Sequence, residues 1–261
     1  MNPQMRRRMA STALIIGFFV AWEVLCLMFG IKEIVLPRPS QILTTLWERL
    51  PGIMPHAVQT LYTTLVGFAL GIVFGVLLGT FIGSSRLAYD VAYPLLVGFS
   101  SIPKVAVVPI FVLWFGAGTV PAVLTAMILC IFPIVVNVAT GLATTEPELE
   151  DVMRALKASR LDILLNVGLP RAMPYFFASL KVAITVAFIG SIVAETVAAN
   201  KGIGYLMLTA SSRFEMPLAF AGLLVVSLMG IGMYAVASVV ETRMTGWATR
   251  GMDAGVSASP G

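Results

Sequence analysis

Charged side chains are scarce in this sequence. Asp, Glu, Lys and Arg make up 11% of the 261 residues and hydrophobic residues 58%, whereas about 25% of the residues in a soluble domain are charged. The length leaves room for about six apolar helices of ~20 residues but for no large soluble domain. The sequence therefore predicts an all-α membrane protein, with any nucleotide-hydrolysing domain on a separate chain.

Histidine and cysteine are also scarce. The chain has one histidine, His56, and two cysteines, Cys26 and Cys130, which lie in apolar runs where a thiol usually acts as a small hydrophobic group. Because no Cys/His cluster is present, we expect no metal site and no cofactor. The sequence also lacks a Walker A lysine and a Gly-x-Ser-x-Gly turn, and Gly202-x-Gly204 lacks the third glycine of a dinucleotide fingerprint. Catalytic residues are therefore not expected.

Apolar stretches define six predicted transmembrane helices, at about 11–30, 58–83, 88–114, 119–141, 174–198 and 217–240. The interval from Val105 to Thr145 holds no ionisable Asp, Glu, Lys, Arg or His side chain over 41 residues, enough for about two bilayer crossings. We expect the turn between them at Gly116-Ala117-Gly118. The amphipathic stretch 41–50 is expected to lie in the membrane interface. These assignments give an N-terminus at 1–10, a membrane domain at 11–250 and a disordered tail at 251–261.

Lys and Arg are unevenly divided between the two sides of this topology. One side holds ten of them: Arg6, Arg7, Arg8, Arg86, Arg154, Lys157, Arg160, Arg171, Arg243 and Arg250. The other side holds Lys32, Arg38, Arg49, Lys201 and Arg213. Because cytoplasmic loops are richer in Lys and Arg, both termini and the segment 142–173 are predicted to be cytoplasmic. The basic residues form no face with interleaved aromatic side chains, so no nucleic-acid partner is expected.

The segment 145–170 is polar and lies between long apolar runs. Thr145 and Glu148 have the spacing of a capping box, which predicts a helix start. Ser159 and Asp162 predict a second start, and Pro170 is expected to close the second helix. An apolar face follows the helical period of the first helix: Leu149, Val152, Met153 and Leu156. This face could pack on the chain's own cytoplasmic base or in a groove of a partner protein.

The same segment resembles the EAA loop of permease subunits of binding-protein-dependent ABC importers. That pattern reads E-A-A, three residues, G, nine residues, I-x-L-P. The corresponding residues here are Asp151-Val152-Met153, Lys157 and Val167-Gly168-Leu169-Pro170. Lysine replaces the motif glycine, so the turn would either cost ~1 kcal/mol at positive φ or be lost to a longer helix.

Further strings resemble the nitrate, sulfonate and taurine permease group: Leu36-Pro37-Arg38-Pro39-Ser40, Ile102-Pro103-Lys104-Val105-Ala106, Trp114-Phe115-Gly116-Ala117-Gly118, Ala194-Glu195 and Gly202-Ile203-Gly204-Tyr205. The resemblance implies a six-helix type I (MetI-like) permease in the bacterial inner membrane. It also implies a second permease, as homodimer or pseudodimer, a cytoplasmic ABC ATP-binding subunit and an extracytoplasmic solute-binding protein. By this resemblance the ATPase-coupling residues are Leu149, Glu150, Asp151, Val152, Met153, Arg154, Leu156 and Lys157.

Ionisable residues inside the spans are candidates for function because a charge in hydrocarbon is costly. Lys104 could face the translocation pathway and attract an anion, or its ammonium could bond a carbonyl at a helix break. Glu195 could gate the pathway, pair with Lys201 or make a hydrogen bond between helices. We expect Lys181 to reach the cytoplasmic face and Glu23 to find a partner within the bundle.

The resemblance implies import of a small anion such as a sulfonate, taurine or nitrate. Related permeases import pyrimidine vitamin precursors and aromatic acids, so these remain an alternative. An ion-coupled secondary transporter would fit the spans but would leave the segment 145–170 unexplained. An intramembrane enzyme would need paired catalytic groups at the same depth, and Glu195 and Lys104 give little support for such a pair.

Overall fold

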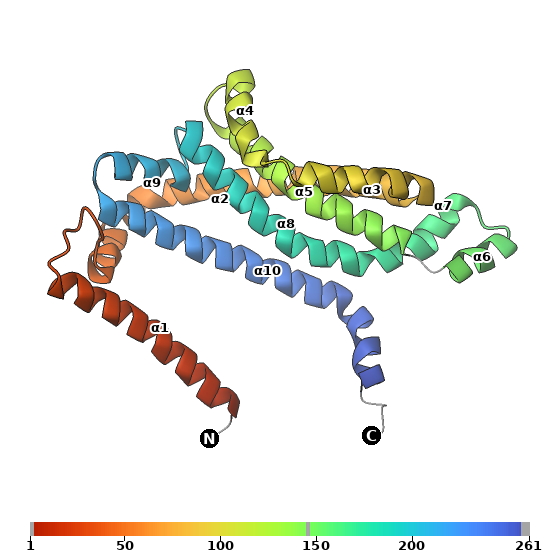
Figure 1. The fold of residues 1–261 in the computed structure, drawn as a ribbon, viewed down its shortest axis with the longest axis horizontal. Coiled ribbons are helices and arrows are strands. Elements are labelled where there is room, and N and C mark those ends of the chain that lie inside the picture. The colour runs from red at the N-terminus through yellow and green to blue at the C-terminus, as the bar shows by residue number, and fades with distance from the viewer. Residues whose placement is uncertain (1–2, 145–146, 257–261) are drawn as a thin grey trace.

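The computed structural model describes residues 3–144 and 147–256, and within those ranges it contains helices and no strand (Figure 1). The α-helices are α1 (Pro3–Met28), α2 (Pro39–Gly83), α3 (Arg86–Ser100), α4 (Val108–Phe115), α5 (Thr119–Ala143), α6 (Pro147–Ala155), α7 (Arg160–Ile163), α8 (Leu169–Ala198), α9 (Ile203–Ser212) and α10 (Met216–Val256). A 3₁₀ turn, Lys104–Val107, precedes α4, and a π-helical turn, Leu164–Gly168, joins α7 to α8.

Five helices in the described part of the chain are long and apolar enough to cross a membrane. A sixth span is formed if α3 and the segment Lys104–Phe115, which are bent by 77° at the break between them, count as one. The prediction of six membrane segments is thus matched by five long helices and one pair of helices that is bent at a break. The break follows Ser100 and includes Pro103, which has no amide hydrogen to continue the helix.

The centre of the bundle is a close contact between α2 and α5. Glycines 67, 71, 75, 79 and 83 of α2 are all buried, and they face residues 126, 130, 134, 138 and 142 of α5. A Cβ added at Gly75 would lie 2.7 Å from Ile134 Cγ2, and one added at Gly71 would overlap Cys130 Sγ. Cys130 is itself fully buried, as a small hydrophobic group would be. On both helices the contacting residues thus recur at every fourth position, along one line. Because the α2 residues on this line are glycines, the two backbones come close together.

The stretch 41–50, which was expected in the membrane interface, forms the N-terminal part of α2. It continues through Pro51 and Pro55 into the span, giving one helix of 45 residues. At 1.5 Å per residue this is about 67 Å, roughly twice the hydrocarbon thickness of a bilayer. A helix of this length can cross the hydrocarbon layer and extend beyond it without a break.

The prediction that Pro170 closes a helix is wrong. The chain runs from α7 through the π-helical turn into α8, and Pro170 lies in the first turn of α8. In the π turn each hydrogen bond joins residues five positions apart, which shifts the hydrogen-bond pattern of the helix that follows. No amide hydrogen is then required at position 170, so proline fits there. Helix α10 also continues to Val256, past the start of the predicted tail at 251, while residues 257–261 lie outside the described range.

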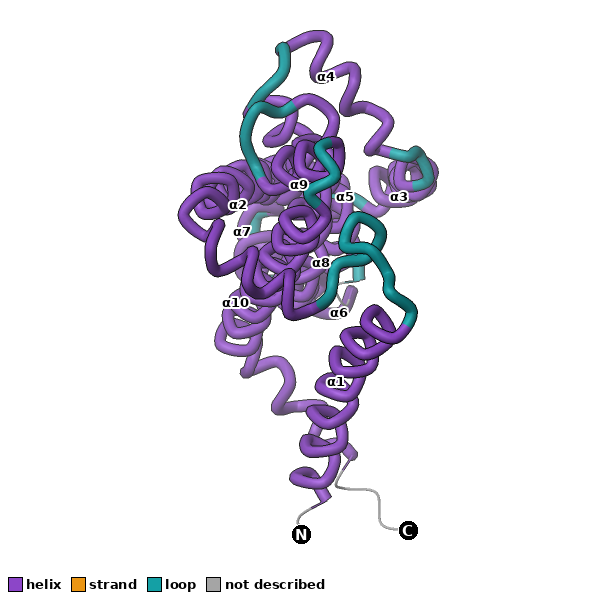
Figure 2. Tube along the Cα trace, turned by 90° about the vertical axis from the view of Figure 1, so that its left-hand side faces the viewer, coloured by secondary structure: helices purple, strands orange, loops and turns teal. Residues whose placement is uncertain are grey.

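The long helices α2, α5, α8 and α10 run side by side (Figure 1). The loop between α1 and α2, together with α9, lies at one end of these helices, and α6 and α7 lie at the opposite end. Helix α1 leans away from the bundle and contacts it mainly near the start of α2. Figure 2 shows that the N-terminal end of α1 and the C-terminal end of α10 lie at the same edge of the molecule.

Candidate functional site

Helix α6 projects beyond the end of the bundle (Figure 1). Its apolar side chains are poorly covered, since Val152 is 58% exposed and Leu156 73% exposed, while Leu149 and Met153 are half-buried. Within the described residues, no other helix packs extensively on α6. The chain's own base therefore does not bury this face, which leaves two large aliphatic side chains exposed to solvent.

Polar residues of α6 lie beside the apolar face. Arg154 Nη1 is 3.4 Å from Asp151 Oδ1, and both side chains are exposed. Such an exposed pair adds little stability by itself, typically less than about 1 kcal/mol. The side chain of Glu150 and all of Thr145 lie outside the described residues, so the predicted capping box at 145 is not part of the described structure.

Lys157 ends α6 in a left-handed conformation, with φ 60°. The amide of Ala158 donates to the Met153 carbonyl at 3.0 Å, and the amide of Lys157 donates to the Arg154 carbonyl at 2.9 Å. These two bonds form a Schellman motif, in which glycine is the usual residue at this position. Of the two outcomes that the sequence left open, the structure has the sharp turn rather than a longer helix.

The second predicted helix start is confirmed. Ser159 Oγ accepts from the Asp162 amide at 3.2 Å, and Asp162 Oδ2 accepts from the Ser159 amide at 3.0 Å, which is a reciprocal capping box for α7. Because α7 continues through the π turn into α8, the segment after α6 is joined to a membrane helix without a flexible linker.

Glu195 lies at the other end of the bundle, 1% exposed, between α2, α8 and α9. Thr60 Oγ1 donates to Glu195 Oε2 at 2.7 Å, and the Gly204 amide donates to the same oxygen at 3.2 Å. Thr63 Oγ1 donates to Oε1 at 3.2 Å and is hydrogen-bonded to Ser191. Thr60 Oγ1 in turn accepts from the Ile203 amide at 2.8 Å. We call these residues, Thr60, Thr63, Ser191, Glu195, Ile203 and Gly204, the Glu195 network.

The Gly202-Ile203-Gly204 string fits closely against this network. Gly202 has φ +121°, and a Cβ there would overlap the Glu195 carboxyl group. A Cβ on Gly204 would lie 2.9 Å from Glu195 Cβ. His56 Nδ1 accepts from the Gly202 amide at 3.1 Å. The glycines therefore let the start of α9 approach the carboxylate, where the helix N-terminus favours negative charge.

Lys104 is half-buried at the break between α3 and α4. Its ammonium donates to the Ser100 carbonyl at 3.0 Å and lies 4.6 Å from the centre of the Phe132 ring. The carbonyl at the helix end and the ring face are both attractive partners for a cation. In this conformation the charge is therefore engaged within the chain.

Two further charged residues of the predicted spans, Glu23 and Lys181, also have partners. Glu23 accepts from the amide of Ser40 at 3.0 Å and from its hydroxyl at 2.7 Å, so α1 bonds the first turn of α2. Lys181 Nζ forms an ion pair of 2.5 Å with Glu241, which links α8 to α10. The prediction that Glu23 is partnered within the bundle is confirmed, and the partner of Lys181 was not foreseen.

Sequence reasoning missed most of the Glu195 network. Thr60, Thr63 and Ser191 are ordinary residues in apolar helices, and only their buried position gives them a role. The available signals were the spacing of Thr60 and Thr63 on one helical face and the two glycines at the start of α9, Gly202 and Gly204. Among the described residues, Glu195 forms no ion pair with Lys201, which is exposed.

Comparison with known proteins agrees with this arrangement. A family profile described as the binding-protein-dependent transport system inner membrane component matches residues 71–246. The chain is 32% identical to the formylaminopyrimidine transport permease protein ThiX of Halalkalibacterium halodurans, over 90% of this chain and 94% of the relative. It is 34% identical to the riboflavin transport system permease protein RibX of Chloroflexus aurantiacus, over 87% of this chain and 86% of the relative.

Relatives of lower identity include transporters of anions. The putative aliphatic sulfonates transport permease SsuC of Bacillus subtilis is 26% identical, over 87% of this chain and 83% of the relative. The nitrate import permease NrtB of Leptolyngbya laminosa is 28% identical, over 91% and 88%.

Among solved structures, an inward-facing conformation of the MetNI methionine ABC transporter shares the fold, with a TM-score of 0.59, 18% identity and coverage of 77% of this chain and 97% of that chain. The long apolar helices, the projecting α6 with its EAA-like sequence and the family match lead to one identification. The chain belongs to the inner membrane components of binding-protein-dependent transport systems and is a permease subunit of an ABC importer, in the group that includes sulfonate and nitrate permeases, with ATP hydrolysis on a partner chain.

Proposed function

We propose that this permease receives the force of ATP hydrolysis through α6. Val152 and Leu156, supported by Leu149 and Met153, enter a cleft of the ATP-binding subunit, and Glu150, Asp151 and Arg154 form the polar rim. The exposed aliphatic face of α6 carries this proposal, since two such side chains gain free energy when a partner covers them. The sharp end of α6 at Lys157 then directs the chain back toward the membrane.

The path from this contact to the membrane is short and stiff. Helix α7 is capped by Ser159 and Asp162 and continues through the π turn into α8. A displacement of α6 by the ATPase would therefore move α8 rather than be absorbed by a loose linker. We propose the same orientation as the charge distribution predicts, with α6 and both termini in the cytoplasm, and a second permease, a copy of this chain, completing the pathway.

The coupling proposal is tested by Val152→Asp and Met153→Asp in the complete importer. A carboxylate in a buried apolar interface loses the aliphatic contact and adds a desolvation cost, so we expect ATPase recovery with the purified permease to fall by at least about tenfold. Membrane insertion should be normal. Glu148→Gln, an exposed residue of α6 outside the proposed contact, is the control and should retain most of the ATPase. Unchanged recovery with both Asp variants would refute the proposal.

We further propose that the transported solute is a heterocyclic vitamin or vitamin precursor rather than a small inorganic or organic anion. The relatives named for such substrates are 32% and 34% identical, compared with 26% and 28% for the sulfonate and nitrate permeases. The ammonium of Lys104 donates to the Ser100 carbonyl and lies over the Phe132 ring, but it keeps its charge and further N–H donors, so it favours neither class of solute. The anion remains the second candidate because those permeases belong to the same group.

The substrate proposal is tested with the solute-binding protein that co-purifies with this permease. Calorimetry with formylaminopyrimidine, riboflavin, taurine and nitrate should give binding of one of the two heterocycles only. Binding of taurine or nitrate alone would overturn the substrate class while leaving the coupling proposal intact.

For Glu195 we propose an architectural role in place of contact with the solute. Both carboxyl oxygens are occupied by donors from α2 and α9, and the side chain is buried. The Glu195 network then holds the start of α9 against α2 and α8 at the end of the bundle opposite α6 (Figure 1).

A further inference from the structure

Asp90 differs from the other charged residues of the predicted spans. It lies in the second turn of α3, and its side chain is exposed. Within the described ranges it forms no ion pair, although Arg86 lies one turn before it. Charged side chains in membrane segments almost always face the interior of a bundle or water, because a charge in hydrocarbon is costly. The side of α3 that carries Asp90 therefore needs a polar neighbour from outside this chain.

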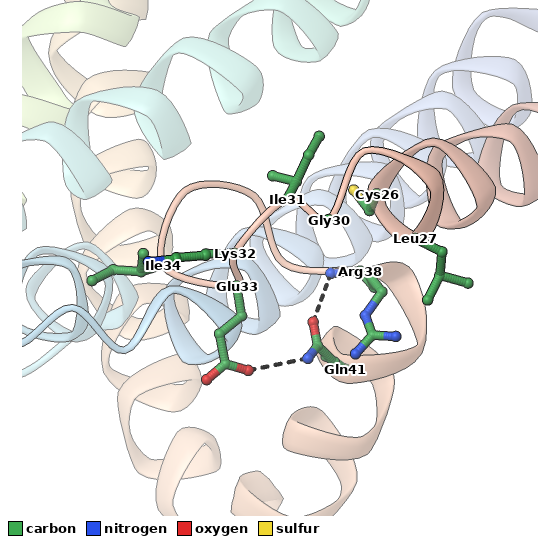
Figure 3. A pocket seen from close by; sticks show the side chains of 9 residues that line it. All are labelled: Cys26, Leu27, Gly30, Ile31, Lys32, Glu33, Ile34, Arg38 and Gln41. Carbon is green, nitrogen blue, oxygen red and sulfur yellow. Dashed lines mark hydrogen bonds between the residues drawn. The ribbon is translucent and has the colours of Figure 1, made fainter.

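The charged residues where α1 ends and α2 begins give a contrast. The open groove beside Arg38 (Figure 3) also holds Lys32 and Glu33, and Glu33 Oε2 accepts from Gln41 Nε2 at 3.0 Å. Glu23 lies close to Arg38. Two cations are thus matched by two carboxylates, so this groove needs no further charged partner.

Asp90 belongs to a stripe along one face of α3. Positions 86, 90, 93, 97 and 101 are spaced by four, three, four and four residues, which keeps their side chains on one side of a helix. These residues, all exposed, are Arg86, Asp90, Tyr93, Val97 and Ser101. The backbone of Ser101 is still helical, and its hydroxyl donates to the Val97 carbonyl at 3.4 Å. We call these five residues the Asp90 stripe.

The other sides of α3 are mainly apolar. One side is half-buried against the bundle, and its residues are Ala88, Tyr89, Ala92 and Leu96. The hydroxyl of Tyr89 is hydrogen-bonded to Thr140 of α5 at 3.2 Å, which fixes this side against α5. Another side is exposed and has no polar side chain: Leu87, Val91 and Leu95. Helix α3 therefore exposes one side that suits lipid and one, the Asp90 stripe, that does not.

The Asp90 stripe extends deep into the span. At 1.5 Å per residue, Ser101 lies about 16 Å along the helix from Asp90, which is about half the hydrocarbon thickness of a bilayer. Its far end therefore cannot reach the same headgroup layer as Asp90. Beyond Ser101 the chain bends at Pro103, and the ammonium of Lys104 donates to the Ser100 carbonyl. Figure 2 shows α3 at the edge of the bundle, where a neighbouring subunit can face it.

We propose that the Asp90 stripe lines the water-filled pathway along which the solute crosses the membrane, between this permease and its second copy. The inference rests on the proposed transport by a pair of permeases and adds the residues that line the path. The carboxylate of Asp90 and the hydroxyls of Tyr93 and Ser101 face water and the polar groups of the solute. The apolar side of α3 faces lipid.

Thiol accessibility in the complete importer, held in lipid nanodiscs, tests the proposal. Val97 lies in the Asp90 stripe and Val91 on the apolar side, and they are 49% and 61% exposed in the single chain. A charged methanethiosulfonate reagent is the probe. It reacts with a thiolate, which forms in water and not in hydrocarbon, so Val97→Cys should react at least about tenfold faster than Val91→Cys. Wild type, whose cysteines are buried, gives the background rate.

The two valines also separate the pathway from simple depth. Val91 is nearer than Val97 to the start of α3, so depth alone would make Val91→Cys the faster one. Ser101→Cys should react like Val97→Cys, and Leu95→Cys like Val91→Cys. Each variant is first checked for normal recovery of the ATPase, which shows that the importer has assembled.

Equal rates at the two valines, or a faster reaction at Val91→Cys, would overturn the proposal. So would labelling of Asp90→Cys without labelling of Val97→Cys and Ser101→Cys, because Asp90 would then lie only at the membrane edge. A disulfide between two copies of Val97→Cys in place of labelling would show a dry contact and would also refute it. These failures would leave the contact of α6 with the ATPase intact, since ATPase recovery is measured separately.

Discussion

Lys157 occupies a backbone conformation that an L-residue adopts at a cost of about 1 kcal/mol relative to glycine. The Schellman bonds to Met153 and Arg154 hold it there. Lys157→Gly should therefore stabilise the end of α6 by up to about 1 kcal/mol, because the relief of strain at positive φ exceeds the extra freedom that glycine gains in the unfolded state. Hydrogen exchange of the Lys157 and Ala158 amides should slow by about fivefold.

Lys157→Ala is the control, because alanine keeps the Cβ that disfavours positive φ. Its exchange should match that of wild type. If both variants protect the two amides equally, the side chain rather than the backbone determines the stability of this turn.

Gly202 is the residue on which the Glu195 network depends most sharply. A Cβ there would overlap the Glu195 carboxyl group, and φ +121° is a region that other residues rarely adopt. We expect Gly202→Ala to cost about 3 kcal/mol or more, which lowers the thermal unfolding midpoint by about 6–12 °C for a chain of this size. Gly52→Ala, whose Cβ would meet nothing within 4 Å, should leave the midpoint within a few degrees of wild type or raise it. Equal thermal unfolding midpoints for Gly202→Ala and Gly52→Ala would refute the architectural role proposed for Glu195.

At the scale of helices, the contact between α2 and α5 gives a compensation test. Gly71→Ala places a Cβ where Cys130 Sγ lies, so it should destabilise the bundle by about 1–3 kcal/mol. Cys130→Ala removes that sulfur, and the Gly71→Ala/Cys130→Ala double variant should recover more than half of the loss. Additive losses in the thermal midpoints of the single and double variants would mean that these two helices are not in direct contact at this point.

The helices themselves could largely be predicted from the sequence. The six apolar stretches, the turn at Gly116 and Gly118, the break at Pro103 and the capping box of Ser159 and Asp162 all follow from local chemistry. The helix boundaries that differ from the structure lie at prolines. Pro51 and Pro55 lie within α2, and Pro170 lies within the first turn of α8 instead of ending a helix. Whether a proline ends a helix depends on the neighbouring packing and hydrogen bonds, which the sequence does not contain.

Residue contacts between distant helices could not be predicted. The sequence predicted a partner for Glu23, left a partner as one of several possibilities for Glu195, and placed Lys181 at the cytoplasmic face. Their actual partners, Ser40, the threonines of α2 and Glu241, are determined by the folded arrangement. The left-handed conformation of Lys157 was one of two possibilities, and that of Phe214, with φ 60° at the end of α9, gave no signal at all. Local patterns determine where helices begin, whereas tertiary packing decides which polar groups meet.

At the scale of the whole molecule, the two ends of the bundle differ in which side chains they expose and bury. The end with α6 exposes an apolar face, while the opposite end is held together by the Glu195 network and carries the groove beside Arg38 (Figure 1). This division fits a permease that receives force at one end and presents a stable surface at the other. The continuous path from α6 through α7 to α8 connects the exposed face to the membrane bundle.

The central claim, that the exposed face of α6 contacts the ATP-binding subunit, is tested most directly by site-specific cross-linking in native membranes. Leu156→Cys presents a reactive thiol on α6, and the native Cys26 and Cys130 are buried and should react little. A photoactivatable thiol reagent should join Leu156→Cys to the ATPase subunit, whereas Leu208→Cys on α9, at the opposite end, should give no such product. Efficient labelling of Leu156→Cys without an ATPase adduct, or an equal adduct from Leu208→Cys, would contradict the account.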